Sequence, residues 1–130
     1  MTDRELIDIA LCAMKNAYAP YSKCLVGAAI LCDDGSVYSG CNVENASYSL
    51  TVCAERIAIF KAVSEEKKDF SAIAVAGSAD GDFSRNCTPC GACLQVMSEF
   101  CGGDFTIILA DGEHKLSEFF PVSFNKENLK

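Results

Sequence analysis

The sequence predicts one α/β domain, residues 1–130, in which a mixed sheet carries helices on both faces. Predicted helices and strands alternate along the chain, with no linker, repeat or low-complexity segment between them. An Asp-Gly turn joins the first two strands, and strand-helix-strand succession follows in the second half. These observations favour antiparallel pairing at the start of the sheet and parallel pairing later.

In the first half, apolar side chains recur at helical spacing over residues 3–17, with Thr2 as the N-cap and Tyr18-Ala19-Pro20-Tyr21 as the end. Residues 25–32 and 36–41 are predicted strands that flank Asp33-Asp34-Gly35. The pair therefore reads as an antiparallel hairpin.

In the second half, we expect a helix over residues 53–64, a buried strand over 72–76, a helix from 90 to about 101 and a strand over 105–110. The strand-helix-strand order indicates parallel pairing. Two cysteine motifs would then lie at the N-termini of the two helices, in the region of an open α/β sheet where ligands bind.

Composition excludes several classes of protein. The net charge is −7 and no basic cluster is present, which disfavours a nucleic-acid polymer as partner and favours a small, nearly neutral substrate. No apolar run is long enough to cross a membrane. The charged N-terminus lacks a signal-peptide pattern, so we expect a cytoplasmic protein whose cysteines are thiols or metal ligands.

The cysteine motifs are Cys53-Ala54-Glu55 and Pro89-Cys90-Gly91-Ala92-Cys93. Three thiolates can hold one Zn²⁺ per chain and leave a fourth position for a water, the arrangement of a catalytic zinc site. Glu55 is suited to moving protons to and from that water.

Cys87 is the rival ligand, because Cys87-Thr88-Pro89-Cys90 is also a C-x-x-C motif. We prefer Cys53, Cys90 and Cys93, since Pro89 and Gly91 frame Cys90 as a helix start. Other cysteines lie in apolar surroundings and are expected to be small buried side chains: Cys12, Cys32 and Cys101.

Three thiolates on Zn²⁺ carry a formal charge of −1, which positive ends of helix dipoles at the two motifs would offset. Arg56 follows Cys53 by three residues and shares its face of the helix, so its guanidinium can reach the thiolates. An exposed helix charge is the alternative for Arg56.

The chain resembles the cytidine deaminases, in particular the short, homotetrameric form with three zinc-binding cysteines. The resemblance covers essentially the whole chain and rests on these segments: Ala19–Ser22, Val26–Ala29, Asn42–Tyr48, Cys53–Arg56 and Phe119–Phe124. It implies a three-layer α/β/α fold with a mixed sheet of about five strands. The implied reaction is zinc-dependent hydrolytic deamination of cytidine and 2′-deoxycytidine to uridine and 2′-deoxyuridine with release of ammonia, a step of pyrimidine salvage.

The resemblance also assigns roles to residues. Asn42 and Glu44, which lie two apart and face one side of an extended segment, would bind the ribose. Glu55 would take a proton from the attacking water, protonate N3 and then serve the departing amino group. The backbone near Ala54 and Thr88 would contact the base. Phe124 would reach the pyrimidine of a neighbouring subunit, placing active sites at subunit interfaces.

Two positions depart from the family pattern. Cys24 stands where a phenylalanine commonly lines the base pocket, and Leu94 stands where an arginine usually follows the second motif. His114 lies in a predicted polar turn and is not expected to be a ligand. The alternatives are deamination of another nucleoside or base analogue, including a base in RNA, and an inactive zinc-stabilised module. The intact Glu55 argues against the module.

Overall fold

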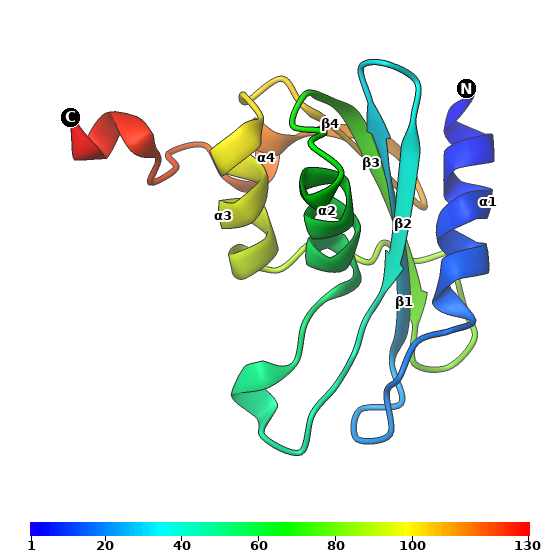
Figure 1. Cartoon of the computed structure of the whole chain (residues 1–130). Coiled ribbons are helices and arrows are strands. Elements are labelled where there is room, and N and C mark those ends of the chain that lie inside the picture. The colour runs from blue at the N-terminus through cyan, green and yellow to red at the C-terminus, as the bar shows by residue number, and fades with distance from the viewer.

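The computed structural model describes residues 1–130 and shows one five-stranded sheet between two helical layers (Figure 1). The strands are β1 (Leu25–Cys32), β2 (Val37–Cys41), β3 (Phe70–Ser78), β4 (Thr106–Leu109) and β5 (Gly112–Lys115). Their order in the sheet is β2-β1-β3-β4-β5. Only the β3–β4 pair is parallel. The mixed α/β/α architecture predicted from the sequence is confirmed.

The helices are α1 (Asp3–Met14), α2 (Ala54–Ser64), α3 (Gly91–Phe100) and the single turn α4 (Leu116–Phe119), with 3₁₀ turns η1 (Tyr48–Leu50) and η2 (Lys126–Leu129). The prediction for the first helix was too long, because α1 ends at Met14. Strand β5 was not predicted, and His114 lies in this strand rather than in a turn. Its sequence, Gly-Glu-His-Lys, lacks the apolar alternation that signals a strand.

Helix α1 covers one face of the sheet. Thr2 begins it with a capping box, in which the Thr2 hydroxyl accepts from the Glu5 amide at 3.1 Å and the Glu5 carboxylate accepts from the Thr2 amide at 3.0 Å. The helix lies so close to β1 that a Cβ on Gly27 would be 1.9 Å from the Ala10 carbonyl oxygen. Glycine at position 27 therefore permits this packing.

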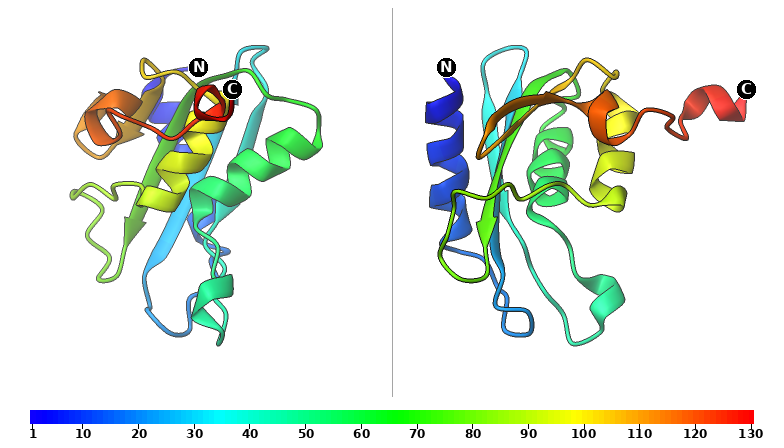
Figure 2. Two further views of the ribbon diagram at one scale, coloured as in Figure 1. Left: turned by 90° about the vertical axis from the view of Figure 1, so that its left-hand side faces the viewer. Right: turned by 180° about the vertical axis from the view of Figure 1, so that it is seen from behind.

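Helices α2 and α3 cover the opposite face, as the view from behind also shows (Figure 2, right). The strands alternate between the two layers because successive side chains point to opposite faces. Ala28 and Ile30 join the large core under α2 and α3, whereas Ala29 joins the small core under α1. The larger core thus fixes the two helices that carry the cysteine motifs.

The segment between β2 and α2 extends beyond the sheet and includes η1 (Figure 1). Val43 in this segment forms isolated bridges with Tyr18 on one side and Val52 on the other. The C-terminal η2 projects away from the layers on the side of α3. None of the helices has the length and apolar composition required to cross a membrane.

Candidate active site

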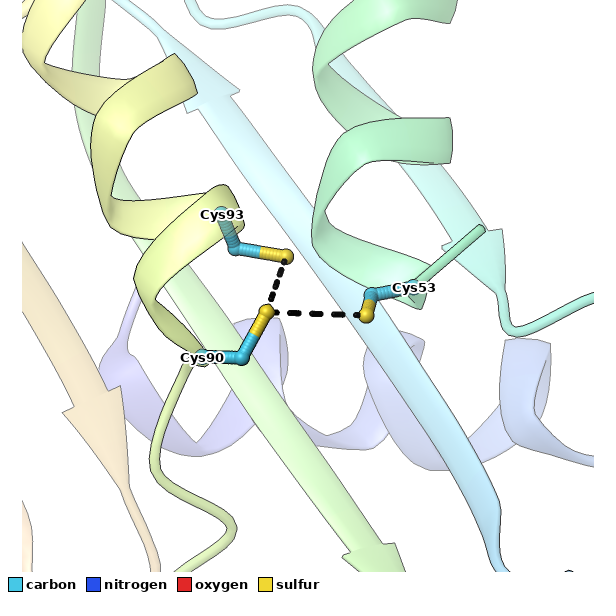
Figure 3. A group of neighbouring side chains, drawn as sticks. All are labelled: Cys53, Cys90 and Cys93. Carbon is cyan, nitrogen blue, oxygen red and sulfur yellow. Dashed lines mark hydrogen bonds between the residues drawn. The ribbon is translucent and has the colours of Figure 1, made fainter. Parts of the chain in front are cut away.

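Three cysteines meet where α2 and α3 begin (Figure 3). Cys53 is the N-cap of α2 and Cys90 is the N-cap of α3, and neither side chain caps its helix with a hydrogen bond. Cys93 lies on the first turn of α3 and is buried. Because the cap positions leave both sulfurs uncommitted, all three can point toward one centre.

The sulfur positions fit a zinc ion. The Sγ atoms of Cys53 and Cys90 are 3.8 Å apart, those of Cys90 and Cys93 are 3.6 Å apart, and all three lie within 4.8 Å of one another. Tetrahedral Zn²⁺ with bonds of about 2.3 Å separates two sulfurs by about 3.8 Å. All nine cysteines are free, and Cys87 lies outside the group of three.

Arg56 contacts the cysteine cluster. Its Nη2 donates to Cys53 Sγ at 3.4 Å, while its Nε is buried and has no hydrogen-bond partner. Hydrogen bonding from Cys93, together with Arg56, lowers the pKa of Cys53 to about 5, whereas the interaction with Cys53 raises the pKa of Cys93. The site thus already favours a thiolate at Cys53, the form that binds a metal.

Glu55 is the buried carboxylate of this site, with an exposed fraction of only 4%. Burial is the main cause that raises its pKa, and the nearby Cys53 adds to the effect. Glu55 borders a cavity of about 230 Å³ that we call the catalytic cavity. Its lining is Val26, Asn42, Glu44, Thr51, Cys53, Ala54, Glu55, Cys87, Thr88 and Cys90.

Asn42 and Glu44 are buried and lie on the extended segment between β2 and α2. Asn42 Oδ1 accepts from the Val26 amide at 2.9 Å, and Asn42 Nδ2 donates to the Cys24 carbonyl at 2.8 Å. Glu44 accepts from the amides of Tyr21 and Ser22 at 3.0 and 3.1 Å. Both side chains are therefore fixed against the loop that enters β1.

Most residues singled out from the sequence lie together. Ala54 and Thr88 line the catalytic cavity with the residues named above, whereas Phe124 does not line it within this chain. Leu94 is buried in the core under α3. Cys12 is exposed, so the expectation that it is buried was wrong.

Ser22 and Thr51, which line the catalytic cavity or a neighbouring one, are among the residues that received no role from the sequence, and Cys87 was considered only as a rival ligand. Burial raises the pKa of Cys87 to about 11, so its thiol stays protonated. Thr51 and Ser22 come from irregular segments, where hydrophobic periodicity gives no signal. For Ser22, the only signal was its place in the segment Ala19–Ser22, which resembles the family.

Residues 1–109 match the family model described as the cytidine and deoxycytidylate deaminase zinc-binding region. The chain belongs to this family. The matched residues include the three clustered cysteines and Glu55, and the family model describes a zinc-binding region. The cofactor implied by these sulfur ligands is therefore Zn²⁺.

Among individual proteins, the chain is similar to cytidine deaminases. It is 48% identical to the one from Halalkalibacterium halodurans over 133 aligned positions, covering 98% of each chain. It is 47% identical to that from Sporosarcina psychrophila, covering 90% of this chain and 87% of the relative. The crystal structure of cytidine deaminase from Burkholderia pseudomallei matches with a TM-score of 0.86 and 43% identity, covering 95% of this chain and all of that one.

Proposed function

We propose that the protein, as one domain over residues 1–130, is a zinc-dependent hydrolase that converts cytidine and 2′-deoxycytidine to uridine and 2′-deoxyuridine with release of ammonia. The observation that carries the proposal is the position of Glu55. Its carboxylate is buried next to a three-cysteine cluster and borders the same cavity as Asn42 and Glu44. A proton carrier, a metal site and sugar-binding groups therefore face one space.

Zn²⁺ held by Cys53, Cys90 and Cys93 would supply a Lewis acid that makes a water more acidic. Glu55 accepts a proton from that water and passes it to N3 of the pyrimidine while the water oxygen adds to C4. It then moves the remaining proton of that oxygen to the 4-amino nitrogen, which leaves as ammonia, so one carboxylate serves as base and acid in turn. Burial raises the pKa of Glu55, which makes its protonated form easier to reach at neutral pH.

Arg56 offsets the negative charge of the three thiolates. Its contact with Cys53 at 3.4 Å supports this role. An arginine beside a thiolate stabilises the ionised form that the metal requires. Because Leu94 supplies no charge at the position after Cys93, this compensation falls on Arg56 and the two helix N-termini.

Asn42 and Glu44 orient the sugar, and the backbone at Ala54 and Thr88 contacts the base. The lining of the catalytic cavity supports both assignments, since all four residues border it. No lysine or arginine lines this cavity, which disfavours a phosphate group there and favours a nucleoside substrate. The nine free cysteines support a cytoplasmic location, where thiols stay reduced.

The homotetramer with shared active sites is part of the proposal. Phe124 is 58% exposed and lies outside the catalytic cavity of its own chain. Val122 and Leu129 in the same C-terminal segment are even more exposed. A projecting apolar segment of this kind is suited to packing on a second copy, where Phe124 would stack on the substrate base.

The test is an ultraviolet assay of purified protein with its zinc content measured. Cytidine and 2′-deoxycytidine should lose their amino group, whereas adenosine and free cytosine should react far more slowly. The Glu55→Gln variant should keep zinc and fold but lose about 10²–10⁴-fold in turnover, because it keeps the shape and removes the proton carrier. Turnover of adenosine alone, or a fully active Glu55→Gln variant, would contradict the proposed reaction.

A further inference from the structure

The carboxylate of Glu44 is held by one short turn of the chain, residues 21–22. Its Oε1 accepts from the amides of Tyr21 at 3.0 Å and Ser22 at 3.1 Å. Its Oε2 accepts from the hydroxyl of Ser22. Glu44 is 9% exposed and borders the catalytic cavity, and it also borders a neighbouring cavity of about 400 Å³ together with Ser22. Glu44 thus lies where the two cavities meet, and Ser22 holds it from the side of the neighbouring cavity.

These contacts leave Glu44 with one free acceptor position. An ionised carboxylate has about four lone-pair positions, two on each oxygen. The two amides occupy Oε1, and the Ser22 hydroxyl occupies half of Oε2. The remaining position on Oε2 can accept one hydroxyl of a ligand. Glu44 therefore cannot accept two neighbouring sugar hydroxyls at once.

The Ser22 hydroxyl is itself fixed. Its oxygen accepts from the Cys24 amide at 3.0 Å, so its single hydrogen is free to point to Glu44. The hydroxyl is also the largest cause that lowers the pKa of Glu44, in agreement with donation to the ionised form. One side chain thus connects the carboxylate to the loop that begins β1.

We infer that Ser22 is a positioning residue for Glu44, whose hydroxyl leaves a single Oε2 acceptor aimed at one sugar hydroxyl of the substrate. This inference rests on the proposed function, because it assumes that Glu44 meets a nucleoside sugar. Without the hydroxyl, Oε2 has two open positions and the carboxylate is held through Oε1 alone. The sugar then binds less tightly, while Glu55 and the cysteine cluster are untouched.

The loop has a main-chain closure besides the contact between this hydroxyl and the Cys24 amide. The main chain closes it through the Lys23 amide, which donates to the Ala19 carbonyl at 3.1 Å. The amides of Tyr21 and Ser22 remain available to Oε1 in any variant at position 22. Since Ser22 is exposed, threonine has room for its methyl group and keeps the hydroxyl. Comparing Ser22→Ala with Ser22→Thr therefore distinguishes the effect of the hydroxyl from an effect on folding.

The experiment measures kcat and KM for cytidine, and the inhibition constant of 2′,3′-dideoxycytidine, which lacks both sugar hydroxyls. For Ser22→Ala we expect KM for cytidine to rise about tenfold with little change in kcat, the scale of one charge-assisted hydrogen bond. Binding of the dideoxynucleoside should change less than about twofold, because Glu44 has no hydroxyl to accept from it. Ser22→Thr should restore cytidine binding.

The control is Ser36→Ala, which removes a serine hydroxyl that also donates to a carboxylate, Asp34, at 2.6 Å in the β1–β2 turn. It should leave both constants unchanged. Equal weakening of cytidine and the dideoxynucleoside, a loss confined to kcat, or no rescue by threonine would overturn the positioning role. If the wild-type protein deaminates none of the nucleosides, the proposed function fails and this inference fails with it. An active wild type with an unaffected Ser22→Ala variant overturns the inference alone.

Discussion

Gly40 of β2 lies so close to the first turn of α2 that a Cβ on it would stand 2.8 Å from the carbonyl oxygen of Ala54. The same Cβ would be 2.7 Å from the amide nitrogen of Ala58. Backbone atoms cannot rotate away, so any side chain here must displace the helix. The N-terminus of that helix carries Cys53 and Glu55.

Gly40→Ala should therefore disturb both folding and metal binding. We expect the free energy of unfolding to fall by about 1–3 kcal/mol, the usual cost of overpacking, and zinc affinity to fall as Cys53 moves from the other two sulfurs. Chemical denaturation and competition with a zinc chelator measure the two effects. The control is Gly102→Ala, where a Cβ meets nothing within 4 Å. Unchanged zinc affinity in a destabilised Gly40→Ala variant would show that the metal site does not depend on the position of α2 against β2.

Zinc binding should distinguish Cys90 from Cys87. Cys90→Ala removes one of the three clustered sulfurs, so metal content and activity should both be lost. Cys87→Ala should keep one zinc per chain, because this thiol lies outside the cluster and burial raises its pKa to about 11. Atomic absorption of the two purified variants decides the matter. Zinc lost from Cys87→Ala but retained in Cys90→Ala would reverse the ligand assignment.

His114 should make stability depend on pH. Its ring nitrogens lie 2.7 Å from Asp111 and 2.9 Å from Glu118, and these carboxylates raise the pKa of His114 above 6.5. Because the folded protein holds the proton more tightly, this contribution is complete below pH 6.5 and is lost as pH rises through the folded pKa. The pKa values of Asp111 and Glu118 are lowered, chiefly by His114, so their contribution is lost only in acid.

The measurement is the free energy of unfolding between about pH 6 and pH 8 for the wild type and His114→Gln. The wild type should lose stability relative to the variant as pH rises. Since other groups titrate equally in both proteins, the difference between the two curves reports His114. Parallel curves would mean that the ion pairs contribute nothing to folding.

Phe124 tests the shared active site. Glu55→Gln and Phe124→Ala should each be nearly inactive alone, while mixed oligomers should regain activity at sites that combine an intact Glu55 with an intact Phe124 from another chain. Co-expression with two different tags, isolation of the mixed oligomer and an assay with cytidine measure the recovery. No recovery in a verified, folded mixed oligomer would remove Phe124 from the neighbour's site and leave the zinc chemistry untouched.

Much of the architecture follows from periodic patterns in the sequence. The hairpin at Asp33–Gly35, the buried strand around Ile73 and the helices after Cys53 and Cys90 were predicted because apolar spacing and turn residues are local signals. Strand β5 was missed because it is polar and pairs at an edge of the sheet. The meeting of Cys53 with Cys90 and Cys93 was predicted from ligand chemistry and helix starts.

The hydrogen bonds around Asn42 and Glu44 could not be predicted in this way. Glu44 is held by Ser22, which precedes it by 22 residues in an irregular loop, and no local pattern encodes that contact. The close approach of Gly40 to α2 is equally non-local, since a glycine in a strand has several readings until the partner helix is placed. Contacts between residues far apart in the sequence therefore account for most of the structural features that could not be predicted.

The isolated bridges of Val43 lie in a segment that should open independently of the main sheet. Outside the main sheet, Val43 and Val52 each donate a backbone amide to the carbonyl of the other at 3.0 Å. The Glu44 amide donates to the Tyr18 carbonyl at 2.8 Å. Val43 and Tyr18 are 43% and 55% exposed, so little apolar burial protects these bonds. Local opening here costs less free energy than opening β1, whose residues 28–30 are fully buried. The segment that carries Glu44 can therefore exchange its amide hydrogens while the strands beneath the cysteines stay closed.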